Sequence, residues 1–398
     1  MLRAFVHFAS LHSCTKLLHK KLLVTWALGF TIGIDSMASN KNQHYVPQCY
    51  LRRFSSAESG AAISLFNLDR EKLIENAPIK NQCSKGYFYG DDLVIEKDLQ
   101  PIEGEYSAVI NQIIEPGYKL SEEHKIFLKR FWLLQNMRTD AASKRSVEMS
   151  DEMGVVAGID PSVYRQELKD AVIQSMKIFY EHIDMVDDLK VCLIKNKTNN
   201  EFITSDDPAV LSNKWHILKK SSSGLSFGLG SAGNIILLPL TPNILCLGYD
   251  GDVYSVRHNN GWVDVKDKSD IRSLNEHQFL NCRANIYTHK SNIENELISD
   301  YAKIVSRKPI LRHNITYSVL DRVDNGFKRY KVIDKKEAGD HNKALMHCQM
   351  VYPKPSLWPK QIGWRNKGFV FSNGSGVGYI RRSRIGTMTG EKFRKMRA

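Results

Sequence analysis

Apolar residues recur at helical spacing in the first half of the chain, and this pattern predicts a central block of helices. The clearest example follows Ser121, an N-cap residue, with Glu122 and Glu123 in the first turn, where carboxylates stabilise a helix. Its apolar positions are Ile126, Phe127, Phe131, Leu134 and Met137. We expect two further helices, over 102–114 and from Pro161-Ser162, with proline in the first turn, to Ile183.

Short runs rich in β-branched and aromatic residues predict strands on both sides of this block. They lie at 63–66 and 87–89 before it, and at 190–194, 201–204, 235–238 and 244–247 after it. Helices are expected again over 270–287 and 292–305, followed by a two-stranded segment over 315–332. Because strands and helices occur in blocks and do not alternate, the pattern favours an α+β fold, with a central helical block and flanking antiparallel strands, over a doubly wound sheet.

Prolines and glycines set the end of the chain apart. Pro353, Pro355 and Pro359 mark a linker, and the apolar runs 368–371 and 377–380 flank a Ser-Asn-Gly-Ser-Gly turn, which predicts a small C-terminal β-hairpin. We therefore divide the chain into four parts. They are an extension over 1–36, an α+β domain over 37–335, a linker over 336–358, and an extension over 359–398 rich in basic, aromatic and glycine residues.

The net charge of +13 is concentrated at the two ends. Residues 1–36 carry +3, and residues 359–398 carry +9, from ten Lys or Arg against Glu391. The middle, 37–358, is left with 13 − 3 − 9 = +1. Basicity therefore indicates a nucleic-acid partner only for the C-terminal extension.

The first 36 residues and the cysteines bear on location. Leu22–Ile34 is an apolar run after Lys20-Lys21, which resembles a signal peptide and is too short to span a bilayer as a helix. Met37 offers a second start, and we expect residues 1–36 to be an unfolded upstream extension. The seven cysteines contain no Cys-x-x-Cys pair, so we expect no zinc ribbon. Because their number is odd and their density low, we also expect no disulfide framework, and we expect a cytoplasmic location. The sequence leaves the oligomeric state open.

Polar and aromatic residues are densest in Lys41–Phe54, which reads Lys-Asn-Gln-His-Tyr-Val-Pro-Gln-Cys-Tyr-Leu-Arg-Arg-Phe. Later runs are Gln135-Asn136-Met137-Arg138-Thr139, Phe202–Pro208, Leu238–Pro242, and Asn275 with Arg283. Together they resemble a bacterial family known as domain of unknown function 4238, roughly over 41–290. Cys49 stands where that family usually has an aromatic residue, and Asp207 where it has Asn. The resemblance implies which residues act together and supplies no reaction.

Within this set we predict a catalytic group of His44, Glu105 and Asp206. An imidazole titrates near neutrality and serves as base, acid or metal ligand. Glu105, Asp206 and Asp207 offer the oxygen ligands that Mg²⁺ or Mn²⁺ prefers, so we predict a metal site there. Each has a structural alternative: His44 can hold the Pro47 turn, Glu105 can stabilise a helix N-terminus, and Asp206 or Asp207 can form an Asx turn before Pro208.

Five further residues are predicted to bind substrate or phosphate: Gln48, Arg52, Gln135, Arg138 and Asn275. Spacings of four and three residues place Gln48 with Arg52, and Gln135 with Arg138, on shared helix faces. An arginine fork binds phosphate or carboxylate at two points. The alternatives are an internal salt bridge for Arg52 and a solvated helix edge for Gln135 and Arg138.

The C-terminal extension interleaves aromatic and basic residues, which is typical of single-stranded nucleic-acid binding. The predicted contacts are Trp364, Phe371, Tyr379, Arg381, Arg382 and Arg384. Phosphate-loop, dinucleotide-binding, zinc-protease and α/β-hydrolase motifs are absent, so no nucleotide cofactor is predicted. Three hypotheses follow: a metal-dependent phosphodiester hydrolase, a non-catalytic nucleic-acid or protein binding module whose polar motif is structural, and a sensor of an anionic small molecule.

Overall fold

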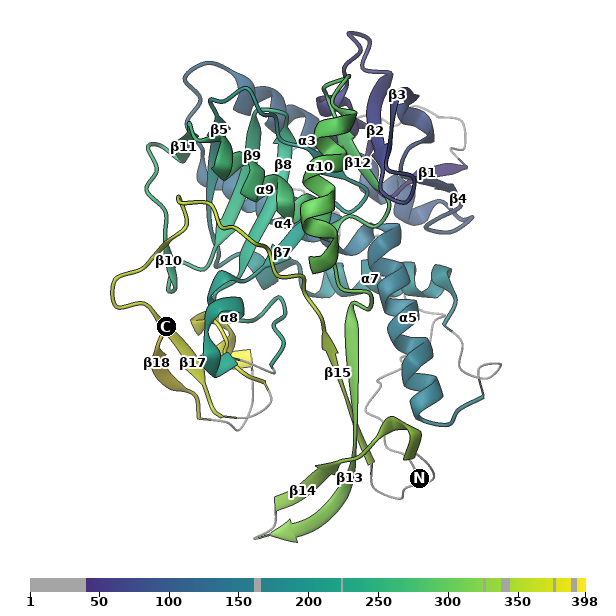
Figure 1. Ribbon diagram of the computed structural model, residues 1–398, viewed down its shortest axis with the longest axis vertical. Coiled ribbons are helices and arrows are strands. Elements are labelled where there is room, and N and C mark those ends of the chain that lie inside the picture. The colour runs from purple at the N-terminus through teal and green to yellow at the C-terminus, as the bar shows by residue number, and fades with distance from the viewer. Residues whose placement is uncertain are drawn as a thin grey trace.

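A five-stranded sheet with helices on both faces forms the centre of the protein (Figure 1). The computed structural model describes residues 41–160, 166–222, 225–324, 327–337, 344–374, 377–387 and 392–398. The sheet order is β11 (Trp262–Val265), β5 (Lys190–Asn196), β9 (Ile244–Tyr249), β8 (Ile235–Thr241) and β7 (Val210–Ser212). Neighbouring strands are antiparallel except for the parallel pair β11 and β5. This agrees with the predicted α+β class.

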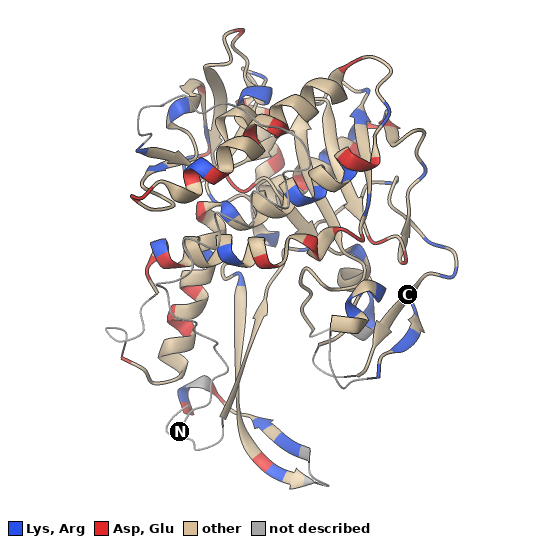
Figure 2. Cartoon of the chain, turned by 180° about the vertical axis from the view of Figure 1, so that it is seen from behind, with Lys and Arg blue, Asp and Glu red and all other residues tan. Residues whose placement is uncertain are grey.

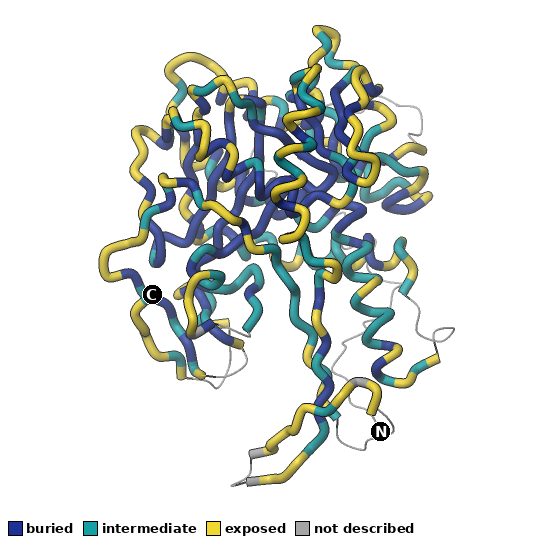
Figure 3. The backbone as a smooth tube through the Cα atoms, in the orientation of Figure 1, coloured by how far each residue is buried: buried dark blue, intermediate teal, exposed yellow. Residues whose placement is uncertain are grey.

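Alternate residues of the central strands enter two different cores. Val191, Leu193, Ile236 and Leu238 face the helical block, whereas Cys192, Ile194, Ile235 and Leu237 face α9 (Lys268–Asn281). The strands are thus buried on both faces, which explains their nearly continuous apolar sequences. Figure 3 shows this burial concentrated in the body of the molecule.

The helical block consists of α3 (Val94–Ile114), α4 (Glu122–Arg138), α5 (Asp140–Val156) and α7 (Leu168–Glu181). The start of α4 is as predicted, since the Ser121 side chain accepts a hydrogen bond from the His124 amide at 3.1 Å. α3 begins eight residues before the predicted 102, with Pro101 inside it. α5 was not predicted. α7 begins at Leu168, and the predicted start at Pro161-Ser162 and the extension 1–36 lie outside the described residues.

A second sheet, of four strands, lies beside the first. Its order is β3 (Lys72–Pro78), β2 (Ala62–Asn67), β12 (Asn285–Thr288) and β6 (Thr204–Ser205). The predicted helix 270–287 is wrong at its end, because 285–288 pairs as a strand with both β2 and β6. The predicted strand 201–204 is reduced to β6, and the next helix, α10 (Glu294–Ile304), lies close to its predicted range.

The opening motif forms β1 (Asn42–His44), which pairs with β4 (Ser84–Gly86), and the short helix α2 (Gln48–Leu51). The predicted strand at 87–89 is wrong. Tyr87 has a positive φ of 53° and starts a turn that ends when the Gly90 amide donates to the Tyr87 carbonyl. Phe88 and Tyr89 are buried in the core beside the helical block, so this run is aromatic because its side chains pack there, although its backbone forms no strand.

A three-stranded arm projects from the body (Figure 1). It consists of β13 (His313–Asp324) between β14 (Phe327–Val332) and β15 (Ala344–Met350). β13 and β14 confirm the predicted two-stranded segment, and β15 lies in the range expected to be a linker. Ile315 and Tyr317 pack the base of the arm against Val156 of α5.

The C-terminal extension packs on the body next to α8 (Lys214–Leu218). Its strands are β16 (Gly363–Trp364), which pairs with β10 (Tyr254–Ser255), and β17 (Phe369–Ser372), which pairs with β18 (Arg394–Arg397). A small C-terminal hairpin is thus present, but β17 meets 377–380 only through a single bridge, Phe371 to Ile380. Ile362 and Val370 are buried in the α9 core, so the extension is part of the folded body. No helix among the described residues is long and apolar enough to cross a membrane.

Candidate functional site

Arg138 is the centre of a buried polar network that joins the opening motif to the end of α4. Its side chain is fully buried, and it donates to the Tyr89 hydroxyl at 2.8 Å, the His44 carbonyl at 2.7 Å and Glu103 Oε1 at 2.9 Å. Gln43 bridges the same region, accepting from the Tyr89 amide at 2.5 Å and donating to the Gly90 carbonyl at 2.9 Å. These bonds use the guanidinium for structure rather than leave it open to a ligand.

The imidazole of His44 faces the protein and not an open site. Its Nε2–H donates to the Lys80 carbonyl at 3.2 Å. Burial, together with the charges of Arg138 and Arg52, lowers the pKa of His44 and favours the neutral ring. The bond ties β1 to the 3-10 helix Ile79–Asn81, so it is structural, but it is not made within the Pro47 turn that the alternative named.

Gln135 lies on the same face of α4 as Arg138, as their spacing predicted, and both are buried, so this face is not a solvated helix edge. Neither side-chain atom of Gln135 has a hydrogen-bond partner in the described part of the chain. Arg138 also keeps Nη1 without a partner. The network therefore contains three buried side-chain atoms that have no hydrogen-bond partner among the described residues.

Asp206 and Asp207 each have both carboxylate oxygens occupied. Asp206 accepts from the backbone amides of Arg283, Ala284 and Asn285 at 2.9, 2.8 and 3.2 Å, which fixes the start of β12. Asp207 is fully buried, and it accepts from the Thr139 hydroxyl at 2.8 Å and from Arg145 Nη1 at 2.6 Å. Burial raises the pKa of Asp206, and its amide bonds oppose this shift.

Glu105 does not join this cluster. It is exposed on α3, where burial of part of its side chain and the neighbouring charge of Glu123 raise its pKa. The carboxylate that reaches Arg138 is Glu103. Among the described residues no three His, Cys, Asp or Glu side chains are placed to hold a metal ion, so Glu105, Asp206 and Asp207 do not form the predicted metal-binding group.

The other predicted binding residues are dispersed. Arg52 Nη2 donates to Gln48 Oε1 at 3.2 Å on the exposed side of α2, as their spacing predicted. Asn275 accepts from the Ile203 amide at 3.2 Å and donates to the Glu201 carbonyl at 2.8 Å, which secures the segment before β6. The structure therefore brings His44 and Arg138 together, with the charge of Arg52 near them, whereas Asn275 bonds the segment before β6.

In the C-terminal extension, several predicted contacts serve to attach it to the body. Arg381 is 3% exposed and bonds Asp188 at 2.8 Å and the Met185 carbonyl at 2.6 Å. Tyr379 packs edge-on against Trp215 at 4.8 Å, and Arg384 donates to the Asp184 carbonyl at 3.1 Å. These residues position the extension and leave other side chains to face solvent.

The outward face of β17 and β18, which we call the aromatic-basic face, carries Phe369, Phe371, Lys395 and Arg397. Val370 and Ser372, on the opposite face of β17, are buried, and the register sets Phe369 opposite Arg397 and Phe371 opposite Lys395. Lys395 Nζ lies 4.0 Å and Arg382 Cζ 4.8 Å from the Phe369 ring centroid. Basic residues therefore gather at this end of the molecule (Figure 2).

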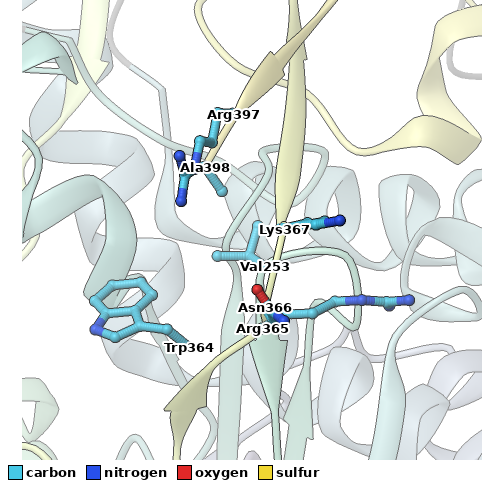
Figure 4. A pocket seen from close by; sticks show the side chains of 8 residues that line it. Val253, Trp364, Arg365, Asn366, Lys367, Arg397 and Ala398 are labelled. Carbon is cyan, nitrogen blue, oxygen red and sulfur yellow. The ribbon is translucent and has the colours of Figure 1, made fainter.

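A hollow of about 280 Å³ adjoins this face (Figure 4). Its lining residues include Trp364, Arg365, Lys367 and Arg397. Trp364 is 50% exposed, and Lys214 Nζ lies 5.2 Å from its ring centroid. Lys214 could not be predicted as a neighbour of Trp364, because α8 is far from the extension along the chain. Tyr89, Glu103 and Arg145 were likewise missed, since only the fold shows which buried partner each one meets.

Comparison with known proteins agrees with the motifs. The model of a family described as "Protein of unknown function (DUF4238)" matches residues 42–292. No curated protein and no solved structure matches the chain. The matched range contains the opening motif, α4 and the 204–208 segment, and it ends before the arm and the C-terminal extension. Since it covers more than half of the sequence, the chain belongs to the DUF4238 family of proteins of unknown function.

Proposed function

We propose that the protein is a non-catalytic nucleic-acid-binding module that holds single strands on its aromatic-basic face. The observation that carries this proposal is the outward side of β17 and β18, where the half-buried rings of Phe369 and Phe371 lie among Lys395, Arg397 and Arg382. Aromatic rings stack with bases of any sequence, and nearby cations follow the phosphates. Trp364 with Lys214 offers a second such pair beside it.

The rigid attachment of the extension supports binding over a solvated tail. Arg381 and Val370 are buried in the body, so the backbone of β17, which carries Phe369 and Phe371, is held in place before a ligand arrives. Pre-organisation of this kind lowers the entropic cost of binding. The hydrolase hypothesis has less support, because the oxygens of Asp206 and Asp207 are already used by protein donors.

The test measures binding of the full chain to labelled single-stranded DNA and RNA of about 20 nucleotides, with Mg²⁺, with Mn²⁺ and with chelator. Phe371→Ala removes a stacking ring, and we expect a roughly 5- to 150-fold loss of affinity, from about 1–3 kcal/mol per stacked base. The double variant Lys395→Gln/Arg397→Gln removes two charges, so the salt slope should fall by about 1.4.

The matched control is Arg70→Gln/Lys72→Gln, which removes two exposed charges at the β2–β3 turn, distant from the extension (Figure 1). We expect this control to bind as the wild type does. Equal losses in the control and in Lys395→Gln/Arg397→Gln, or no binding by the wild type, would overturn the proposal. Metal-dependent cleavage that disappears in Asp206→Ala would replace it with the hydrolase.

A further inference from the structure

The arm becomes narrower toward its end. β15 pairs with β13 only from His313 to Val319, whereas β14 pairs from Ser318 to Asp324. Beyond Val319 the arm is therefore a two-stranded ribbon. At about 3.4 Å per residue, the 12 residues of β13 extend about 40 Å. Figures 1 and 2 show the arm and the C-terminal extension projecting from the same end of the body.

One face of this ribbon is basic. The register sets Arg322 directly opposite Arg329, and Lys331 follows two residues after Arg329, so the three side chains share a face. All three are exposed. Arg322 contacts Asp321 at 3.0 Å, while Arg329 and Lys331 have no ion-pair partner among the described residues. Like charges set opposite each other in a sheet are unfavourable, and a bound polyanion relieves that repulsion.

The shape of the ribbon selects among polyanions. The major groove of B-form DNA is about 12 Å wide and admits a two-stranded β-ribbon. The major groove of A-form RNA is deep and too narrow for side chains to read. A narrow, basic ribbon on a long arm thus matches duplex DNA better than duplex RNA or a flat protein surface.

We propose that the two-stranded end of the arm is a second nucleic-acid contact, which enters the major groove of duplex DNA and places Arg322, Arg329 and Lys331 on the phosphates. The proposal rests on the proposed function, and it adds the substrate class: DNA with a duplex segment beside a single strand. The aromatic-basic face would hold the single strand, and the arm the duplex.

The test uses the full chain and the triple variant Arg322→Gln/Arg329→Gln/Lys331→Gln. The matched control is Arg70→Gln/Lys72→Gln/Lys97→Gln, which removes the same charge from exposed positions elsewhere. Binding is measured to duplex DNA, to duplex RNA and to single-stranded DNA, at several salt concentrations. Thermal melting checks that each variant is folded.

We expect the arm variant alone to lose affinity for duplex DNA, and its salt slope to fall by about 2.7, since each phosphate contact contributes about 0.9. Raising salt fourfold should then weaken the wild type about 40-fold more than the variant. Binding of single-stranded DNA should be unchanged in the arm variant and weakened in Lys395→Gln/Arg397→Gln, with a salt slope lower by about 1.4.

Three results would overturn the inference. Equal duplex affinity in the arm variant and the control would remove the arm from the interface while leaving the proposed function intact. Equal affinity of the wild type for duplex RNA and duplex DNA would reject the groove argument. The opposite face of the ribbon exposes Tyr330 and Val332, which could pack against a second copy of the chain. If the arm variant binds DNA normally but changes from dimer to monomer in light scattering, the arm serves self-association instead. A wild type that binds no nucleic acid would refute the proposed function itself.

Discussion

Replacing Arg138 with Met tests whether the buried motif residues hold the fold or wait for a ligand. The substitution keeps much of the side-chain volume and removes the guanidinium. Three acceptors lose a donor: the Tyr89 hydroxyl, the His44 carbonyl and Glu103. The Tyr89 hydroxyl keeps its own bond to the His44 carbonyl at 3.3 Å, so part of the network survives.

The expected loss in the free energy of unfolding can be worked out from the burial of the Arg138–Glu103 ion pair. Removing one partner of a buried ion pair costs about 3–5 kcal/mol, because the other charge loses its compensation. Glu103 is 27% exposed and can regain some water, which places the expected loss for Arg138→Met near the lower figure, about 3 kcal/mol. Against a total stability of about 5–15 kcal/mol, this is a large loss.

The assay is equilibrium unfolding in urea, followed by circular dichroism. Arg130→Met on the same helix is the matched control. Arg130 binds Asp187 through two bonds, at 3.2 and 2.6 Å, but both side chains are partly exposed at 22% and 30%, so the expected loss is about 1 kcal/mol or less. If Arg138→Met is no more destabilising than this control, the structural interpretation of the motif fails, and a ligand-binding role for Arg138 gains support.

Three further predictions concern other buried groups. Asp207→Ala should lower the free energy of unfolding in urea by about 3–5 kcal/mol, because Arg145 loses its buried partner, and a loss below about 1 kcal/mol would contradict this. Gln135→Met should leave that free energy unchanged or raise it, since no hydrogen bond is lost, whereas a clear loss would show a missing partner. Burial raises the pKa of Glu96 to about 7, so the folded protein binds a proton that the unfolded chain releases near pH 4.5, and stability falls between these values as pH rises. In thermal melts, the melting temperature of Glu96→Gln should therefore rise relative to that of the wild type as pH increases toward about 8, and a constant difference across pH would refute this.

An element could be predicted from the sequence where the residues that determine it lie within that element. α4 starts at its predicted cap because Ser121 satisfies a backbone amide within its own helix. β12 was predicted as the end of a helix, because its strand character comes from β2 and β6, which lie far away in the chain. The pairing of β17 with β18 was missed for the same reason: a Gly-rich turn favoured the nearer partner.

The candidate site shows the same division between local and distant information. Helical spacing placed Gln135 and Arg138 on one face, and the structure shows that this face is buried. Spacing contains nothing about acceptors on other segments, and the groups that occupy Asp206 are backbone amides, which every sequence has. A carboxylate that binds a metal and one that fixes a strand start therefore look alike until the fold is known.

The family-matched region and the rest of the chain differ in what their polar residues contact, and both proposals rest on this difference. Within 42–292, the polar motif residues are largely consumed by internal hydrogen bonds, which join the opening motif, α4 and the 204–208 segment. The arm and the C-terminal extension lie outside that range. In the extension, Arg381, Arg382 and Arg384 pair with aspartates of the body, whereas Lys395 and Arg397 form no ion pair with another described residue. The excess charge lies in the C-terminal extension, which carries +9, while residues 37–358, which include the arm, carry +1. Since attraction to nucleic acid depends on cations that reach the phosphates, we propose that the arm and the C-terminal extension bind the ligand and that the matched region supports them.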